Sequence, residues 1–500
     1  MSTDFSGKRV TVMGLGAFGG GIGAVKFLSA QGALVTVTDL KPAAELAPAL
    51  DQIADCPGVE LRLGGHIERD FRKTDLVVAS PAVPKQSRFL QAARDAGVPV
   101  TSEMNLFWER NPGRTICVTG SSGKSTTTAL IYALLSGSSW VSRGDPAHIP
   151  HQGTAALRSP VPGAARQCVW LGGNIGKSLL PVLAEIQSAD WVVLELSSFQ
   201  LEDLSPCKPN PHVAVVTNFF PNHLDRHGSV EAYRHAKENI LRWQTSDRLA
   251  ILNQSDPDVS LWKTHARKYW FGREDEGRQG LFAVGFDAYK RRALYRNGPR
   301  EQVLPLGNWL SLPGVHNFQN ALAAACTALV LGASASDVAA GLSAFEGLPH
   351  RLQLVAETAG RKFFNDSKAT TPEAALRALD AFRAPVVLLA GGYDKSIDLA
   401  DLARGIVAHR VKAVALLGQT APLIKQYLTQ FDPKGTVSAK VHITLEGAFD
   451  WAVSHSAAGD VVLLSPGCAS YDWFPNYEAR GDEFTRLARA WRESSANAGT

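Results

Sequence analysis

The sequence lacks a long apolar run, paired cysteines and a strong excess of one charge. No apolar run approaches the roughly 20 residues that a membrane-spanning helix needs. The net charge is +4 without a basic block, so we expect neither nucleic acid nor a membrane as a partner. The cysteines are scattered without a C-x-x-C pair, which favours reduced thiols over disulfides or a zinc site: Cys56, Cys117, Cys168, Cys207, Cys326 and Cys468.

The rest of the composition is ordinary for a globular protein, with 45% hydrophobic and 20% charged residues. Residues 1–5 show no basic segment before an apolar core, so we expect no secretory signal and a cytoplasmic location. The 500 residues exceed what one hydrophobic core accommodates. At about 150 residues per domain, the length of the chain predicts about three domains.

The most informative stretch lies between a strand-like run, residues 116–118, and a helix-forming run, residues 129–135. It reads T-G-S-S-G-K-S-T and has the layout of a phosphate-binding loop, in which backbone N–H groups surround phosphate oxygens at a helix N-terminus. Lys124 is placed to neutralise a β- or γ-phosphate, and the Ser125 hydroxyl to ligate Mg²⁺. The candidate nucleotide-binding residues are Gly120, Ser121, Ser122, Gly123, Lys124, Ser125 and Thr126.

The match to G-x-x-x-x-G-K-[ST] is incomplete, because Val118 stands where the first glycine belongs. A Gly/Ser turn with a surface lysine is the alternative. The strand before the turn, the helix after it and the threonines that follow favour a nucleoside triphosphate with Mg²⁺.

A second glycine-rich turn follows the first predicted strand, residues 8–13. It includes Gly14 and Gly16, leads into a helical pattern, and is followed by a strand, residues 34–38, that ends at Asp39. This order fits a dinucleotide-type fold, with glycines close to a diphosphate and Asp39 facing a ribose or base. The extended turn and the lack of a hydride-transfer constellation argue against NAD(P), and simple tight packing of a β–α turn is the other explanation.

Strand and helix patterns alternate along the chain and predict an α/β protein of three consecutive domains. Residues 1–111 form a Rossmann-like domain. Residues 112–347 form a mononucleotide-binding domain with the phosphate loop and a mostly parallel sheet, and residues 348–500 form a second Rossmann-like domain. Residues 136–167 are rich in Gly, Ser, Pro and Ala without periodicity and predict a long, mobile loop or insertion.

Polar residues follow several predicted strands of the central domain, where ligands of parallel sheets gather. They are Asn174 within residues 172–176, Glu195 inside an apolar run, and His223 shortly after Thr217. A carboxylate in an apolar run is costly unless it is paired or binds a metal. A hydroxyl, a carboxylate and an imidazole from separate strand ends make a reasonable Mg²⁺ shell, with a capping or core imidazole as the alternative for His223.

Together these stretches resemble the Mur ligases, the ATP-dependent amino-acid ligases of peptidoglycan synthesis. The family-wide motifs are T-G-S-S-G-K-S-T, N-H-L-D-R-H (222–227) and G-V-H-N-F-Q-N-A (314–321). Others are similar to the branch of the family that adds D-glutamate: G-G-N-I-G (172–176), L-E-L-S-S-F-Q-L-E (194–202), F-N-D-S-K-A-T (364–370), G-G-Y-D-K (391–395) and S-P-G-C-A-S-Y-D (465–472). The resemblance covers nearly the whole chain in the same order.

The resemblance implies a role for each domain and for single residues. The UDP-sugar substrate would contact Gly14, Gly16, Asp39, Ser80 and, from the central domain, Asn174. ATP would contact, besides the phosphate loop, Asn317, Asn320, Arg351 and Asp366. D-Glutamate would contact Lys368, Thr370, Lys395, Ser470 and Tyr477, the last standing where the family has Phe. Two Mg²⁺ ions would be held by Ser125, Glu195, His223 and Lys237, with Lys124, His223 and Lys237 as catalytic residues.

The resemblance also implies a modification and a reaction. Lys237 matches a family lysine that becomes carbamylated and so turns into an anionic Mg²⁺ ligand; without the resemblance it is a solvated helix lysine. The γ-phosphoryl of ATP would pass to the alanyl carboxylate of UDP-MurNAc-L-Ala. D-Glutamate would then displace phosphate from the acyl phosphate. We expect a monomer that acts on small molecules.

Three other interpretations stay open. Another Mur-type or folylpolyglutamate-type ligase would share the family-wide motifs, but F-N-D-S-K-A-T and S-P-G-C-A-S resemble the D-glutamate enzyme. A P-loop switch or motor would not need the first domain's glycine turn, and an NAD(P)-dependent oxidoreductase rests on that turn alone.

Overall fold

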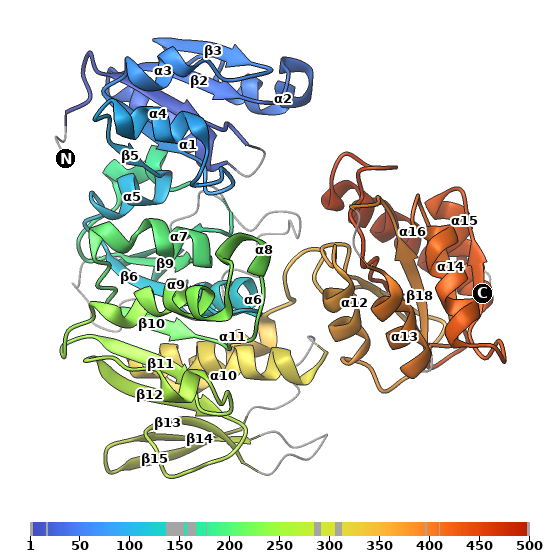
Figure 1. Ribbon diagram of the computed structural model, residues 1–500. Helices are drawn as coiled ribbons and strands as arrows, with labels where there is room; N and C mark the ends of the chain where they lie inside the picture. Colours follow the sequence, from blue (N-terminus) through green and yellow to red (C-terminus); the bar gives the residue numbers. More distant parts are fainter. Residues whose placement is uncertain are drawn as a thin grey trace. The chain divides into compact units, whose positions relative to one another are not determined.

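The computed structural model describes residues 4–16, 19–136, 155–157, 167–176, 178–284, 292–305, 313–395, 398–409 and 411–497. Within these ranges the strands form three sheets (Figure 1). Contacts divide the chain into two compact units, Met1–Gly307 with Gln319–Leu342 and Asn308–Phe318 with Ser343–Thr500. The first unit contains the first two sheets, and the second contains the third. In the described ranges no helix is both long enough and apolar enough to cross a membrane.

The first sheet has five parallel strands in the order β3-β2-β1-β4-β5. The strand order reverses between β1 and β4, so the glycine turn after β1 and the residues after β4 share one edge of the sheet. The strands predicted at residues 8–13 and 34–38 are confirmed as β1 and β2, while β3 was not predicted. The elements are β1 (Arg9–Met13), α1 (Gly20–Ala30), β2 (Leu34–Asp39), α2 (Ala43–Leu50), β3 (Val59–Leu63), α3 (Glu68–Arg72), β4 (Leu76–Ala79), α4 (Arg88–Asp95), β5 (Val100–Thr101) and α5 (Glu103–Trp108).

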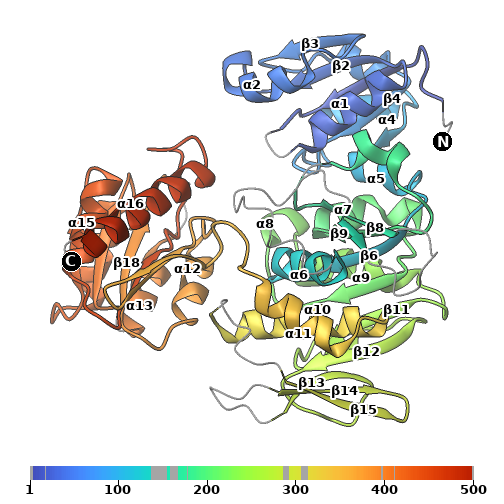
Figure 2. The same cartoon turned by 180° about the vertical axis from the view of Figure 1, so that it is seen from behind.

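The second sheet has ten strands in the order β15-β14-β13-β12-β11-β10-β6-β9-β8-β7. Strands β8 to β13 run parallel and only the outer strands are antiparallel, which confirms a mostly parallel sheet. Helices α7 and α9 cover one face, and α6, α10 and α11 cover the other (Figures 1 and 2). The strands are β6 (Arg114–Thr119), β7 (Ala155–Leu157), β8 (Gln167–Gly173), β9 (Trp191–Glu195), β10 (Val213–Val216), β11 (Leu249–Asn253), β12 (Arg267–Gly272), β13 (Gly280–Val284), β14 (Arg292–Asn297) and β15 (Arg300–Pro305). The helices are α6 (Lys124–Ser136), α7 (Ser198–Asp203), α8 (Leu224–His227), α9 (Val230–Arg242), α10 (Val315–Val330) and α11 (Ala335–Ala344).

The prediction of a long loop over residues 136–167 is wrong where the structure describes this stretch. Ser136 ends α6, Gln167 begins β8, and β7 pairs antiparallel with β8. The other residues of the stretch lie outside the described residues.

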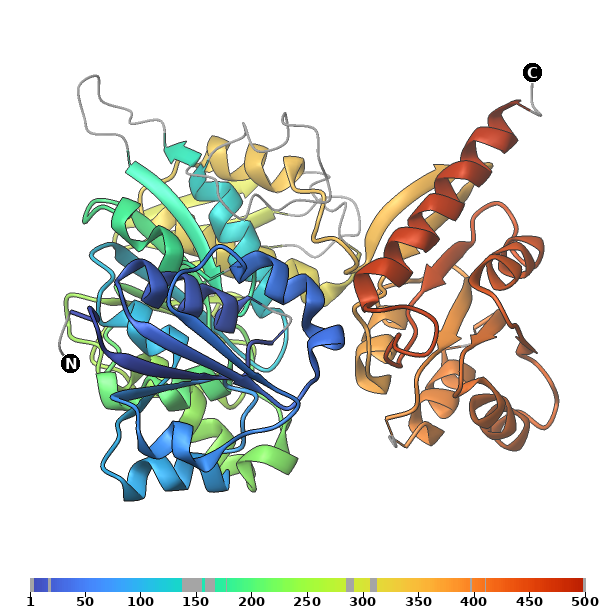
Figure 3. The ribbon, with the colours of Figure 1, turned by 90° about the horizontal axis from the view of Figure 1, so that it is seen from above.

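The third sheet has six strands in the order β16-β17-β21-β18-β19-β20, all parallel except β16. Separate apolar clusters lie on its two faces, one with α12, α13 and α14 and the other with α15 and α16. Figure 3 shows the long helix α16, in dark red, near the C-terminus. The strands are β16 (Gln353–Thr358), β17 (Arg361–Asn365), β18 (Val386–Gly391), β19 (Ala413–Leu417), β20 (Ser438–Val441) and β21 (Val461–Leu464). The helices are α12 (Pro372–Leu379), α13 (Ala400–Ala408), α14 (Ala421–Phe431), α15 (Leu445–Ser454) and α16 (Tyr477–Asn497).

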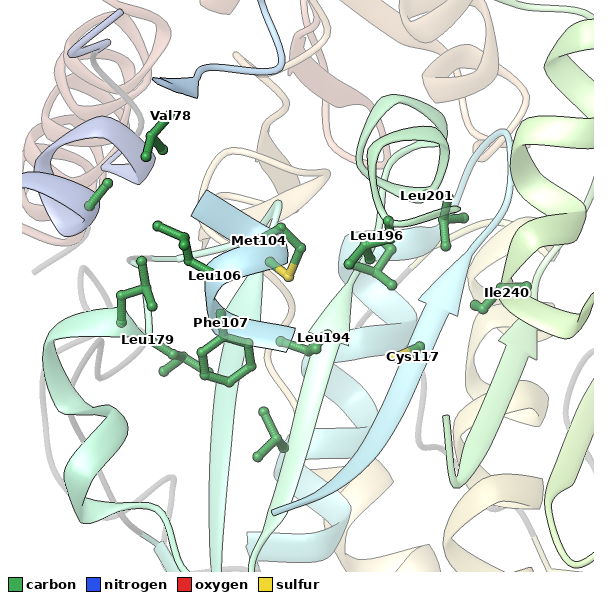
Figure 4. Close-up of a cluster of buried hydrophobic side chains, with 14 of the residues drawn as sticks. Val78, Met104, Leu106, Phe107, Cys117, Leu179, Leu194, Leu196, Leu201 and Ile240 are labelled. Carbon is green, nitrogen blue, oxygen red and sulfur yellow. The ribbon is translucent and has the colours of Figure 1, made fainter. Parts of the chain in front are cut away.

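The first two sheets share one hydrophobic core, and α5 connects them. Its Met104 and Phe107 are buried near Leu179 and Leu194 of the central part (Figure 4). Helix α1 of the first sheet also packs on this region, because a Cβ on Gly23 would lie 2.2 Å from Ser178 Cβ. The boundary predicted at residue 111 therefore falls inside one compact unit, between α5 and β6.

Candidate functional site

The phosphate loop lies between β6 and α6 and is held by the residues that follow the neighbouring strand β10. The Ser121 and Ser122 N–H groups donate to the backbone oxygen (2.9 Å) and Oδ1 (2.8 Å) of Asn218. The Thr217 hydroxyl donates to the Ser122 carbonyl oxygen at 2.6 Å. The adjacent strand therefore fixes the loop backbone.

Both loop glycines are required by their surroundings. Gly120 has φ +150°, and a Cβ there would lie 1.9 Å from Thr217 Oγ1. Gly123 has φ +79°, and a Cβ there would lie 2.1 Å from Asn320 Oδ1. The buried Asn320 thus contacts the phosphate loop. Its predicted contact with the adenine end of ATP stays a prediction.

Two ammonium groups meet at one carbonyl of the loop. Lys124 Nζ donates to the Gly120 and Ser121 carbonyl oxygens at 3.0 and 3.3 Å. Lys237 Nζ, from α9, donates to the same Gly120 oxygen at 2.7 Å. Lys237 is 1% exposed, so the solvated-lysine alternative is wrong. Burial, and then the charge of Lys124, lower the pKa of Lys237 well below its ordinary value.

The next residues of this helix N-terminus also line the loop. Ser125 is buried in the first turn of α6, and Thr126 is half-buried. This arrangement places a hydroxyl and helix N–H groups beside Lys124, as a triphosphate with its cation needs.

Glu195 ends β9, next to β6, and is only 1% exposed. Its Oε1 accepts a hydrogen bond from Asn174 Nδ2 at 3.1 Å. Its Oε2 is buried and has no hydrogen-bond partner among the described residues. A buried carboxylate with one open oxygen is costly unless a cation neutralises it, so this donor fits a metal ligand.

His223 precedes α8 with a left-handed backbone, φ +53°. Its side chain makes no capping bond and is exposed, so neither the capping nor the core alternative describes it. Its ring centroid lies 5.3 Å from that of Phe199. The described residues contain no group of three or more His, Cys, Asp and Glu side chains close enough to hold a metal, so the Mg²⁺ ligand set stays a prediction.

The residues predicted to bind the sugar nucleotide lie at two places in the first unit. Asn174 is beside Glu195, as described above, and the others are at the carboxyl edge of the first sheet. A Cβ on Gly14 (φ +87°) would lie 3.0 Å from Ser80 Cβ, so the turn after β1 touches the end of β4. Asp39 uses both carboxylate oxygens on backbone N–H groups, those of Leu15 (2.9 Å) and Lys41 (3.0 Å). In this structure Asp39 shapes the glycine turn, and its contact with a ribose or base stays a prediction. Gly16 is in the same turn, with φ +65°.

The second unit contains the other nucleotide candidates. Asp366 follows β17 and is buried; its Oδ2 accepts from Ser465 Oγ (2.8 Å) and its Oδ1 from the Leu352 N–H (3.1 Å). Burial raises the pKa of Asp366 to about 7, although the nearby charge of Arg351 lowers it. Asn317 is buried and donates from Nδ2 to the Pro313 oxygen at 2.7 Å.

The predicted D-glutamate residues gather at the carboxyl ends of β17, β21 and β18. Lys368 Nζ lies 5.1 Å from the ring centroid of Tyr477. Thr370 donates its N–H to the Lys368 oxygen at 2.9 Å, and Ser470 is buried. Lys395 lines a small pocket. The structure thus places all five candidates in one unit.

Arg480, which lies beside these candidates, was missed. It is buried in the first turn of α16 at the same helical spacing as the buried Phe484 and Ala488. A cation on an apolar helical stripe is the signal that identifies it.

A phosphate loop at the carboxyl edge of a mostly parallel sheet, in a chain with two further α/β sheets, defines a nucleotide-binding α/β protein. Family models match as follows: the Mur ligase MurD-like N-terminal domain over residues 8–102, the Mur ligase middle domain over residues 118–328, and the Mur ligase glutamate ligase domain over residues 350–468. The chain belongs to the Mur ligase family.

Similar sequences extend over the full chain. It is 38% identical to the UDP-N-acetylmuramoylalanine--D-glutamate ligase of Acidobacterium capsulatum, covering 99% of this chain and 100% of that one. It is 38% identical to the ligase of the same name from Roseiflexus, covering 97% and 99%.

Solved structures share the fold. UDP-N-acetylmuramate-alanine ligase MurC from Thermotoga maritima has a TM-score of 0.58 and 20% identity, covering 97% of this chain and 100% of that one. MurF ligase from Thermotoga maritima, solved in complex with ADP, has a TM-score of 0.53 and 16% identity, covering 98% and 96%.

Proposed function

We propose that this protein joins D-glutamate to UDP-N-acetylmuramoyl-L-alanine at the expense of ATP, releasing ADP and phosphate in peptidoglycan precursor synthesis. The observation that carries the proposal is the 38% identity, over 99% of the chain, to a ligase of that name. The match of residues 350–468 to the glutamate ligase domain supports the same amino acid.

The chemistry requires an activated carboxylate, because the carbonyl carbon of a carboxylate is a poor electrophile. Transfer of the γ-phosphoryl group gives an acyl phosphate, which the amine of D-glutamate attacks with loss of phosphate. We assign the triphosphate to residues 120–126, where Lys124 and the N-terminal amides of α6 neutralise and orient the reacting phosphate.

We assign the metal to the edge formed by Ser125, Glu195, His223 and Lys237. The open Oε2 of Glu195 supports this assignment, since a buried anionic oxygen fits a hard divalent cation. Bound Mg²⁺ supplies charge neutralisation for the transferred phosphoryl group. Asn174 holds Glu195 in place through its 3.1 Å hydrogen bond.

Lys237 is proposed to carry a carbamate. A neutral amine and CO₂ form the carbamate with release of one proton, which replaces a cation by an anionic oxygen ligand. The burial of Lys237 beside the phosphate loop supports the proposal. A carbamate signal in the ¹³C spectrum of the protein in ¹³C-bicarbonate, absent in Lys237→Arg, is the expected result.

We place the UDP-sugar at Gly14, Gly16, Asp39, Ser80 and Asn174, and D-glutamate at Lys368, Thr370, Lys395, Ser470 and Tyr477. ATP also contacts Asn317, Asn320, Arg351 and Asp366. We further propose a monomer that acts in the cytoplasm, and the three domains with the boundaries predicted above. Light scattering that gives a dimer mass would contradict the monomer.

The test is phosphate release with ATP, Mg²⁺ and UDP-MurNAc-L-Ala, adding one amino acid at a time: both enantiomers of glutamate, then alanine, lysine and diaminopimelate. Release with D-glutamate alone is expected. Release with another amino acid would assign the protein to a different Mur-type reaction. Release without the sugar nucleotide would refute the proposed ligase reaction.

A further inference from the structure

Arg480 lies in an unfavourable place for a cation. It is 3% exposed, and it is in the first turn of α16, where the helix dipole disfavours positive charge. A buried charge is tolerated only when it is well hydrogen-bonded. What Arg480 binds therefore indicates why this cation is present.

The guanidinium joins the loops that follow two neighbouring strands. Nε donates to Ser367 Oγ (2.9 Å) and Nη2 donates to the Ser367 carbonyl oxygen (2.9 Å), in the loop after β17. Nη1 and Nη2 each donate to the Cys468 oxygen (3.2 Å), and Nη1 donates to the Ala469 oxygen (3.0 Å), in the loop after β21.

A third loop, after β18, reaches the same point. The Ala469 oxygen that accepts from Arg480 also accepts the Tyr393 N–H at 2.9 Å. A Cβ on Gly392 would lie 3.1 Å from Arg480 Nη1 and 2.1 Å from that same oxygen. Because β17, β21 and β18 are adjacent in the sheet, Arg480 joins two neighbouring loops directly and the third through the Ala469 oxygen.

Each of these loops carries residues assigned above to the amino acid. Lys368 and Thr370 follow Ser367, Lys395 follows Tyr393, and Ser470 follows Ala469. Tyr477 begins the helix that carries Arg480.

We propose that Arg480 is the positioning residue of the amino-acid site: it holds the three loops in the geometry that D-glutamate requires. This inference rests on the proposed function. Burial lowers the pKa of Arg480 to about 10, so the group keeps its charge at neutral pH.

Lysine cannot reproduce this arrangement. Its ammonium has three donors on one atom, whereas the guanidinium presents donors on three nitrogens in a plane. Arg480→Lys therefore keeps the charge and removes the link between the loops. Arg486→Lys is the matched control, because Arg486 is on the same helix, has a side chain 59% exposed and pairs with Glu483.

The experiment measures KM for each of the three substrates. In Arg480→Lys we expect the KM for D-glutamate to rise about 10- to 100-fold. We expect the KM for UDP-MurNAc-L-Ala to change less than about twofold, since its assigned residues all lie in the first unit. The KM for ATP should rise much less than that for D-glutamate, because among the residues assigned to ATP only Asp366 lies in one of these loops. Arg486→Lys should match the wild type. An unchanged KM for D-glutamate, or a parallel rise in all three, would overturn the proposal.

Two further measurements keep the proposal testable if Arg480→Lys does not fold or the reaction is a different one. Ser367→Ala removes one acceptor of the guanidinium and should raise the KM for D-glutamate by a smaller factor, about 3-fold. Amide hydrogen exchange in residues 366–370, 391–395 and 466–470 should be faster in Ser367→Ala than in Arg486→Lys. Equal exchange contradicts the positioning role without reference to any substrate, whereas faster exchange with no D-glutamate-dependent turnover in the wild type contradicts only the proposed function.

Discussion

The buried polar groups at the carboxyl edges of the central and third sheets differ in how fully they are hydrogen-bonded. At the central edge, Glu195 keeps one oxygen without a partner among the described residues, and the ammonium groups of Lys124 and Lys237 meet at the Gly120 oxygen. At the third edge, Arg480 makes five hydrogen bonds. Both oxygens of Asp366 accept hydrogen bonds as well.

This difference matches the two tasks of a ligase of this kind. The central edge has bonding capacity left over for phosphate and metal. At the third edge, Arg480 and Asp366 make hydrogen bonds within the protein that hold loops in position for a small, flexible substrate. A substitution at the central edge should therefore change the chemical step, and one at the third edge should change substrate affinity or stability.

The largest effect is expected at the central edge. Glu195→Gln keeps the shape and the contact to Asn174 but removes the negative charge, so we expect kcat to fall by about 10³-fold or more. Glu185→Gln, at an exposed position of the same unit, is the control and should be neutral. A Glu195→Gln enzyme within tenfold of wild type would show that the open oxygen is not a metal ligand.

The second-largest effect is expected at Gly123, where the cost of backbone strain can be distinguished from the cost of a steric clash. Gly123 and Gly277 have the same φ, +79° and +77°, but only Gly123 has a side chain, Asn320, where its Cβ would lie. Gly123→Ala should therefore lower kcat/KM for ATP about 100-fold, while Gly277→Ala costs about 1 kcal/mol of stability and leaves activity intact. Equal losses in both variants would mean that strain alone, not the loop's contact with Asn320, sets the requirement.

The third effect is on stability and its pH dependence. The pKa of Asp366 is about 7 in the folded protein against an ordinary 3.8. Between these values the unfolded chain releases the proton and the folded protein keeps it, so the stability contributed by this group falls as the pH rises. From pH 4.5 to 7.5, wild type should lose roughly 3 kcal/mol relative to Asp366→Asn in denaturant titrations of the third-sheet unit. A difference between the two proteins that stays constant with pH would contradict the buried-acid description.

The smallest effect is expected at Tyr477. Its ring lies 5.1 Å from Lys368 Nζ, and Tyr477→Phe retains that ring, so the KM for D-glutamate should change less than about twofold. Tyr477→Ala removes the ring and should raise this KM more than about tenfold. Similar KM values for the two variants would show that the ring is not part of the amino-acid site.

Much of the fold could be predicted because buried parallel strands are apolar runs. Strands β1 and β6 are such runs, and both match strands predicted above. Strand β3 reads V-E-L-R-L and β12 begins R-K, so their charged residues hid them. The helix α15 contains Gly447, which weakens a helical pattern.

The parts of the site that depend on residues close together in the sequence could be predicted. The phosphate loop and Glu195 follow from local pattern alone. Lys237 lies on the buried face of α9 with Tyr233, Ala236 and Ile240, so the helical pattern indicates its burial. Its hydrogen-bond partner Gly120 is 117 residues away in the sequence. Arg480 shows the same pattern on α16. A sequence shows that a cation is on an apolar face, but not which distant oxygens receive it.

The core shared by the first two sheets has a consequence for how such proteins diversify by recombination. The match to the MurD-like N-terminal domain ends at residue 102, one residue before α5. A crossover there would keep Met104 and Phe107 with the central part and lose the α1 surface around Gly23 that fits Ser178. In a hybrid of two relatives, the α1 surface and the surface on which it packs would come from different proteins. We therefore expect the first two sheets to be inherited as a single block, whereas the third sheet has its own two apolar clusters and can be exchanged separately.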